Sequence, residues 1–193
     1  MLKPQDVLLS LKLVLVKPRS EWSYKSIASS VGLSIGETYN ALARLKAAGL
    51  AYEKDKALVL VRQRLCELLV FGLPAVYYQE RGPVVRGMLT AKFAPSLAGQ
   101  LGSSKGDIPL VWPHPSGKDR GETLLPLYAS VPAAAEQDEQ LYELLVLCDV
   151  MRVGRPKERE LAKELLVKHV VGESSGGTPA PAGGLVPEFS ALV

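Results

Sequence analysis

Residues 24–50, YKSIASSVGLSIGETYNALARLKAAGL, constrain the fold more than any other part of the chain. Apolar residues recur at helical spacing on both sides of the VGLS segment, and a glycine follows each run, at Gly32 and at Gly49. Glycine readily adopts the positive φ that ends many helices. Ser23 and Ser34 stand where N-terminal caps are needed. The pattern therefore predicts two short helices joined by a tight turn.

The second of these helices, over about residues 34–48, begins with the signature of a capping box. Ser34 and Glu37 have the spacing at which each side chain can bind the free backbone amide of the other residue. Thr38, Leu42 and Leu45 recur at the spacing of one helical face, which we expect to be the inner one. The remaining side chains are then left on the outward side of the helix.

Further patterns flank this helix pair. Residues 5–16, QDVLLSLKLVLV, predict an unusually apolar helix with Asp6 favouring its amino end. Residues 21–23, EWS, form a short segment that can pair as a brief strand. Residues 50–61 place two β-prone runs around the polar turn EKDK and predict a hairpin, and residues 62–72 predict another helix. The order of helix, strand, helix, turn, helix and hairpin is the layout of a winged helix-turn-helix, so the expected fold class is α+β.

The second half of the chain has a different texture. Two strands are expected around a turn at residues 81–83, within weakly periodic sequence. Helices are expected over 133–153, with a break near Gln137, and over 156–170, with Gly154 ending the first of them. We therefore expect three parts, namely a winged helix-turn-helix domain over 1–72, a smaller mixed domain over 73–170 that ends in a helical hairpin, and a flexible tail over 171–193.

Charge and apolar patterning narrow the class of partner. Residues 1–72 carry 11 Lys and Arg against 6 Asp and Glu, whereas residues 73–193 carry 12 against 14. A basic first part favours a polyanionic partner. Cys66 and Cys148 lie in apolar helical patterns, which predicts buried free thiols in a reducing compartment. The sequence shows neither a secretory signal nor an apolar run of about 18 residues, so a cytoplasmic protein without a membrane segment is expected.

The helix pair predicts contact with duplex DNA. Two short helices that cross through a tight turn can present the amino half of the second helix to a major groove. Asparagine can read adenine, apolar side chains can contact the thymine methyl group, and Lys or Arg can bind phosphates, including those under the hairpin. The expected DNA-binding residues are Lys25, Ser34, Ile35, Gly36, Glu37, Tyr39, Asn40, Arg44, Lys46, Lys54, Lys56, Arg62 and Arg64.

The segment SIASSVGLSIGETYNALARLKAAGLA resembles the helix-turn-helix of MarR-type winged-helix transcriptional regulators of bacteria. The positions that carry the match are Ala28, Gly32, Leu33, Ser34, Leu42, Leu45, Gly49 and Leu50. The resemblance implies a sequence-specific regulator of transcription. The long dimerisation helices that flank the domain in that family are not matched at both ends, so the family's dimer geometry is not carried over. A homodimer is expected because readers of palindromic DNA are commonly dimeric.

The second half is similar to stretches of bacterial winged-helix proteins described as transcriptional regulators, on segments such as GPVVRGMLTA and VWPHPSGKDRG. That similarity implies no established role for residues 74–170. We expect this part to bind either a small-molecule effector or a protein partner. The modest charge of the first part keeps an alternative open, namely an antitoxin-like or complex-assembling interaction module in which the winged helix is only a scaffold.

Enzymatic chemistry is the third hypothesis, and one cluster motivates it. His114 lies in a loop-rich segment with Asp107, Asp119 and Glu122, which could join it in a site for hydrolase or transferase chemistry. The chain has no phosphate-binding loop and no nucleophile elbow, and its two histidines lack the spaced partners of a zinc site. We therefore expect no enzyme, no metal and no cofactor.

Overall fold

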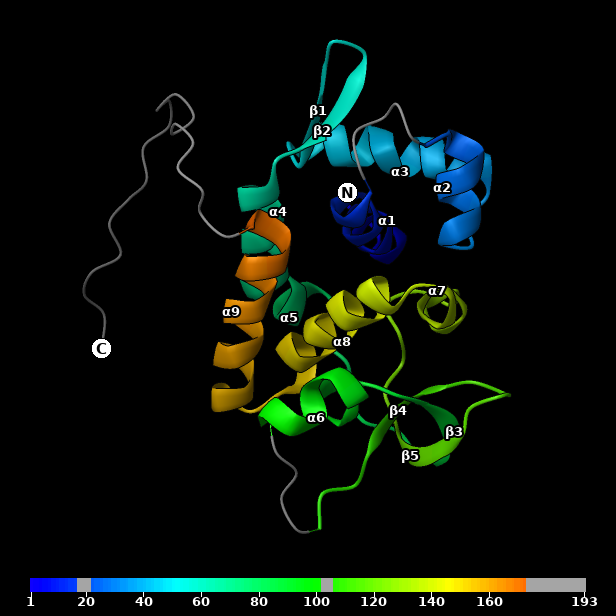
Figure 1. Ribbon diagram of the computed structural model, residues 1–193, viewed down its shortest axis with the longest axis vertical. Coiled ribbons are helices and arrows are strands. Elements are labelled where there is room, and N and C mark those ends of the chain that lie inside the picture. The colour runs from blue at the N-terminus through cyan, green and yellow to red at the C-terminus, as the bar shows by residue number, and fades with distance from the viewer. Residues whose placement is uncertain (17–21, 102–105, 173–193) are drawn as a thin grey trace, which may run out of the picture.

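The computed structural model describes residues 1–16, 22–101 and 106–172 (Figure 1). Over these residues helices pack with two small sheets, and this confirms a mixed α+β class. In chain order the elements are α1 (Pro4–Leu15), α2 (Tyr24–Ser30), α3 (Ile35–Ala47), β1 (Ala51–Lys54), β2 (Ala57–Leu60), α4 (Arg62–Glu67), the π-helix η2 (Leu68–Gly72), α5 (Leu73–Val76), β3 (Val84–Leu89), the 3₁₀-helix η3 (Ala91–Phe93), α6 (Pro95–Leu101), β4 (Leu110–Pro113), β5 (Asp119–Thr123), α7 (Val131–Gln137), α8 (Glu139–Val153) and α9 (Pro156–Val171).

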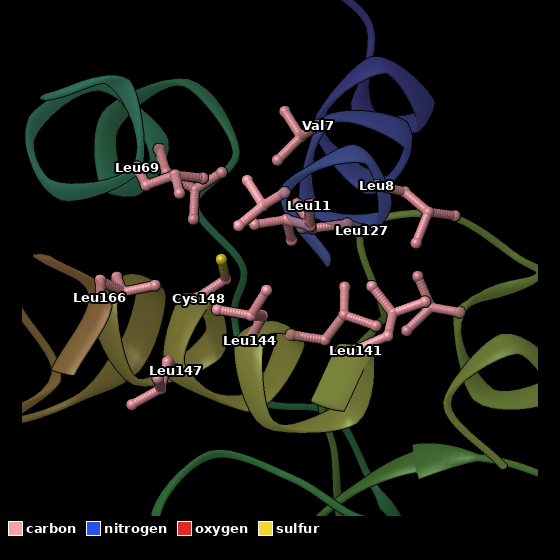
Figure 2. Close-up of a cluster of buried hydrophobic side chains, with 14 of the residues drawn as sticks. Val7, Leu8, Leu11, Leu69, Leu127, Leu141, Leu144, Leu147, Cys148 and Leu166 are labelled. Atoms are coloured by element: carbon pink, nitrogen blue, oxygen red, sulfur yellow. The ribbon is translucent and has the colours of Figure 1, made fainter. Parts of the chain in front are cut away.

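Helix α1 lies in the middle of the hydrophobic core. Its side chains are buried around most of the helix, and α1 packs against α3 on one side and α8 on the other. Figure 2 shows Leu8 and Leu11 of α1 opposite Leu141 and Leu144 of α8. One continuous apolar cluster therefore includes residues from both sides of the predicted boundary at residue 72.

The α2–turn–α3 segment follows its sequence signals. The Ser23 hydroxyl accepts a hydrogen bond from the backbone N–H of Ser26, which caps α2. Gly32 has a φ of +65° in the turn, as predicted. The predicted capping box is only half formed, because Ser34 accepts from the N–H of Glu37 but the Glu37 carboxylate binds other side chains. The turn is therefore built by one cap and one left-handed glycine.

The hairpin that follows α3 has a shorter turn than predicted. Strands β1 and β2 pair antiparallel from Ala51 opposite Leu60 to Lys54 opposite Ala57. Asp55 and Lys56 alone form the turn, both with positive φ, which is the geometry of a two-residue type I′ connection. Figure 1 shows the hairpin projecting from one end of the molecule next to α3.

Two other local predictions need correction. Trp22 and Ser23 do not form the predicted brief strand, and Glu21 lies outside the described residues. The predicted helix over 62–72 is present as α4 and η2, and it continues past its expected end through α5. Pro74 explains the wide turn, because proline lacks an N–H and its ring clashes with the carbonyl four residues earlier in an α-helix. The N–H of Leu73 accordingly donates to the carbonyl of Leu68, five residues back.

The second sheet is a small closed set of three strands. β3 pairs antiparallel with both β4 and β5, while β4 and β5 pair parallel with each other. Such closure brings backbones close together, and a Cβ atom at Gly87 would overlap the backbone carbonyl of Trp112. Only one of the two strands predicted around residues 81–83 is present, because residues 77–82 are not in a strand.

The helices of the second half match their prediction closely. α7 ends at Gln137, and Asp138 then caps α8 by accepting a hydrogen bond from the N–H of Leu141. Gly154 separates α8 from α9, and Pro156 is the first residue of α9. Of the predicted tail over 171–193, residues 173–193 lie outside the described part of the chain.

A buried polar cluster attaches the three-stranded sheet to α8. The Asp149 carboxylate accepts hydrogen bonds from the Thr90 hydroxyl, the Trp112 indole and the Arg152 guanidinium, at 2.6–2.7 Å. These three donors offset part of the cost of burying the carboxylate, and burial still raises the pKa of Asp149. Cys66 and Cys148 are buried free thiols, as predicted, and burial raises the pKa of each.

Candidate nucleic-acid interface

One face of α3 is exposed along the whole helix. We call it the α3 outer face. Its residues are Ile35, Gly36, Tyr39, Asn40, Ala43 and Lys46. Ile35 is 54% exposed and Tyr39 is 64% exposed, whereas Leu42 and Leu45 on the opposite face are buried. A Cβ atom added at Gly36 would meet no other atom within 4 Å. The predicted reading face of this helix is thus open to an approaching partner.

Arg44 does not belong to this face. Its guanidinium donates two hydrogen bonds to the Asp6 carboxylate, at 2.7 and 2.8 Å, and a third to Glu37. Asp6 is fully buried and lies on α1. The hydrogen bond to Asp6 is the largest cause of a raised pKa of Arg44, so the guanidinium stays charged. Arg44 therefore leaves the predicted set of phosphate contacts, because its donors are used inside the protein.

Glu37 is committed in the same way. Its carboxylate accepts hydrogen bonds from Arg44 and from the Gln5 side chain, at 3.0 Å in the latter case. The hydrogen bond from Arg44 is the largest cause of a lowered pKa of Glu37. Sequence reasoning placed Asp6 only as a helix cap and missed Gln5. A carboxylate inside an apolar helix was the available signal, since buried charges are paired.

The four lysines predicted to contact phosphates lie on α2, on α3 and on the hairpin. Lys54 ends β1 and Lys56 lies in its turn, and both are exposed, as is Lys25 on α2. Lys46 forms a long ion pair with Glu53, 3.4 Å, between exposed side chains. Such surface pairs are weak. Exposed lysines therefore lie on the helix before α3 and on the hairpin after it.

The two arginines of α4 are oriented differently from the prediction. Arg62 donates to the backbone carbonyls of Val14 and Val170, and so binds the carboxyl ends of both α1 and α9. It therefore does not surround the hairpin tip as predicted. The Arg64 guanidinium lies against Gly49, where it covers the end of α3.

An aromatic row that sequence reasoning missed borders the α3 outer face. The ring centroids of Trp22 and Tyr24 are 6.0 Å apart, and those of Tyr24 and Tyr39 are 6.3 Å apart. Tyr24 and Tyr39 are too far apart in sequence for helical spacing to indicate the contact. The row holds Tyr39 at the edge of the face.

The second half of the chain contacts the α2–α3 turn and leaves the α3 outer face open. The Ser130 hydroxyl donates to the backbone carbonyl of Val31 across 2.6 Å. Lys12 of α1 forms an ion pair of 2.6 Å with Asp138, between α7 and α8. These contacts fix the turn and α1 against α7 and α8.

Two of the three acidic residues expected to join His114 bind other side chains. Asp107 binds Lys92, while Glu122 faces Arg81. The Nδ1 atom of His114 lies 3.6 Å from the carboxylate of Glu136. Within residues 1–16, 22–101 and 106–172, no group of three or more His, Cys, Asp or Glu side chains could hold a metal ion.

Comparisons with known proteins give no match to a family model, to a curated protein or to a solved structure. In the described residues, none of the helices combines the length and the apolar character needed to cross a membrane. The geometry of α3 and its hairpin is thus the main observation that bears on function.

Proposed function

We propose that residues 22–61 form a winged helix-turn-helix and that the chain is a sequence-specific DNA-binding regulator of transcription. α3 enters the major groove, and the β1–β2 hairpin lies over the neighbouring phosphates or minor groove. The observation that supports this proposal is the open α3 outer face next to a projecting hairpin (Figure 1). The resemblance of residues 26–51 to MarR-type regulators agrees with it.

The shape of the α3 outer face suits a groove. With 3.6 residues per turn, Gly36 and Ala43 lie along the middle of the face, and larger side chains flank them. A centre of small residues lets the helix backbone approach base edges closely. In this proposal Lys25, Lys54 and Lys56 bind phosphates, and these contacts fix the register of the helix on the duplex.

Salt dependence of binding provides the test. Each phosphate contact contributes about 0.9 to the slope of log K against log salt concentration for duplex DNA. We expect the full chain to bind duplex DNA from upstream of its own gene, measured by fluorescence anisotropy between about 50 and 200 mM salt. Lys54→Ala should lower the slope by about 0.9.

Lys157→Ala is the matched control, because Lys157 is an exposed lysine in the first turn of α9. Val170, at the other end of α9, binds Arg62 just after the hairpin. At a rise of 1.5 Å per residue, Lys157 lies about 20 Å along α9 from that end. The control should keep the wild-type slope. Absence of duplex binding at the lowest salt concentration would contradict the proposal.

An interaction module is the second candidate, and specific side chains favour it. Ile35, Tyr39 and Tyr52 are large and about half exposed or more, at 54%, 64% and 48%. Ile35 and Tyr39 lie one helical turn apart on α3, and such exposed aliphatic and aromatic side chains fit a protein partner as well as DNA. A stoichiometric partner whose binding is lost in Ile35→Asp, without salt-dependent DNA binding, would favour this candidate.

The proposal includes a homodimer and an effector or partner site in residues 74–170. A surface groove of about 470 Å³ lies between α6 and α8, lined by Pro95, Ser96, Glu139, Gln140, Tyr142 and Glu143. A dimer that reads two half-sites would place its two α3 helices about 34 Å apart, which spin-label distances can measure on the DNA complex.

A further inference from the structure

We propose that α3 reads A·T base pairs at the centre of its half-site, with Asn40 on an adenine and Ile35 on a thymine methyl group. This inference rests on the proposed function, because it assigns the DNA sequence class that the same face recognises. The inference follows from two observations on α3. Some side chains able to read bases are exposed, and others are bound to residues of the chain itself.

Guanine is usually read by an Arg or Lys that binds its O6 and N7 atoms. Arg44 is withdrawn from this role by its two hydrogen bonds to the buried Asp6 carboxylate. Lys46 lies in the last turn of α3, next to Glu53 of the hairpin, whereas recognition helices insert their amino halves. The inserted half of the helix therefore presents no cation to a guanine.

Cytosine is read by an Asp or Glu that accepts from its N4 amino group. Glu37 is the acidic residue in the first turn of α3. Its carboxylate is bound by Arg44 and Gln5, on the side of the helix that faces α1. A base could reach Glu37 only by displacing these partners, so a G·C pair finds neither of its usual readers.

The exposed side chains that remain match the other base pair. The Asn40 amide is exposed and can bind the N6 and N7 atoms of adenine together. Ile35 is 54% exposed and can cover the C5 methyl group of thymine. Five helical residues separate the two, which sets them about 140° apart around the axis, on opposite flanks of the small centre at Gly36. They therefore reach different base pairs.

The first experiment selects preferred sites. The full chain is incubated with duplexes that carry a random 12-bp core, and bound duplexes are sequenced. We expect A·T pairs to be enriched at two positions. Asn40→Ala should reduce the enrichment at one position, Ile35→Ala should reduce it at the other, and Gln100→Ala on α6 should change neither. Thermal unfolding confirms that each exposed-site variant is folded.

The second experiment removes single atoms from the selected duplex. Replacing the adenine by 7-deazaadenine removes its N7 acceptor and should weaken wild-type binding about tenfold, with no effect on Asn40→Ala. Replacing the thymine by uracil removes the methyl group and should weaken binding about threefold, with no effect on Ile35→Ala.

Three results would overturn the inference. G·C enrichment at the positions sensitive to Asn40 or Ile35 would contradict it while duplex binding, and with it the proposed function, stands. A·T enrichment that both variants retain would show that DNA shape, not these side chains, is read. If the full chain binds no duplex at low salt, both the proposed function and this inference are rejected.

Discussion

The hydroxyl of Ser130 donates a hydrogen bond to the backbone carbonyl of Val31, which is 99 residues earlier in the chain. Val31 ends α2, and Ser130 immediately precedes α7. The contact is close, since a Cβ atom at the neighbouring Gly32 would lie 2.7 Å from the Cβ of Ser130. The turn that orients α3 is thus held by the second half of the chain.

Ser130→Ala tests how much this hydrogen bond stabilises the protein. We expect the free energy of unfolding to fall by about 1–2 kcal/mol, because the carbonyl of Val31 loses its partner in a partly buried place. Urea unfolding followed by tryptophan fluorescence measures the change. Ser116→Ala, in the exposed loop between β4 and β5, is the matched control. Equal losses in the two variants would show that the tether contributes nothing.

The two glycines of the α2–α3 segment should respond to alanine in opposite directions. Gly32→Ala forces an L-residue into a left-handed conformation, which costs about 1–2 kcal/mol before the overlap with Ser130 is added. Gly36→Ala places its methyl group in open space within a helix and should stabilise by about 0.5 kcal/mol. Thermal unfolding measures both changes.

Gly36 also separates stability from binding. If α3 enters a groove, Gly36→Leu should fold as well as the wild type but bind duplex DNA more weakly, because the side chain holds the helix away from the bases. Unchanged DNA affinity in a folded Gly36→Leu protein would remove this position from the interface.

The ion pair between Asp6 and Arg44 should matter far more than the one between Glu37 and Arg44. Asp6→Ala leaves a charged guanidinium facing a buried site, and we expect a loss of about 3 kcal/mol or more. Glu37→Ala removes a carboxylate that is one quarter exposed and should cost less than about 1 kcal/mol. Urea midpoints of the two variants check the ranking, and similar losses would contradict it.

Asp138 should make stability depend on acid pH. Burial acts to raise the pKa of Asp138, but hydrogen bonds from Lys12 and from the N–H of Leu141 outweigh it, so the pKa is lowered. A lowered pKa stabilises the fold above the ordinary carboxyl pKa, and this stabilisation is lost as the pH falls through the lowered value. Asp138→Asn should therefore be less stable than the wild type at neutral pH.

Urea midpoints measured from about pH 6 down to about pH 2.5 test this dependence. The difference between the wild type and Asp138→Asn should shrink towards the acid end. Glu164→Gln, at an exposed position of α9, should show no comparable difference. A gap between wild type and Asp138→Asn that stays constant across the range would show that the carboxylate is not stabilised by its charge.

Local signals explain what the sequence could predict of this fold. Ser23 and Gly32 act through neighbouring backbone groups, so their effect is visible in a few adjacent residues. The same holds for the break at Asp138 and for Pro156 at the start of α9. The exposed side of α3 also follows directly from its helical period, which placed Ile35, Tyr39 and Asn40 outward.

Contacts between distant residues explain what it could not. Nothing near Arg44 in the sequence indicates that its partner is Asp6, 38 residues earlier. Arg62 likewise looks like any exposed arginine until the ends of α1 and α9 meet beside it. The pairing of β3 with β4 and β5 depends on closure of a very small sheet, and short strands carry little periodic signal.

The position of α1 in the core has a consequence for folding during synthesis. α1 emerges from the ribosome well before α8, against which its leucines pack in the folded chain. Asp138, the ion-pair partner of Lys12, is synthesised 126 residues later. At ordinary rates of translation this interval is on the order of ten seconds. During that interval the apolar side chains of α1 are not yet buried against α8. The packing of α1 against α8 can therefore be completed only after synthesis has passed residue 153.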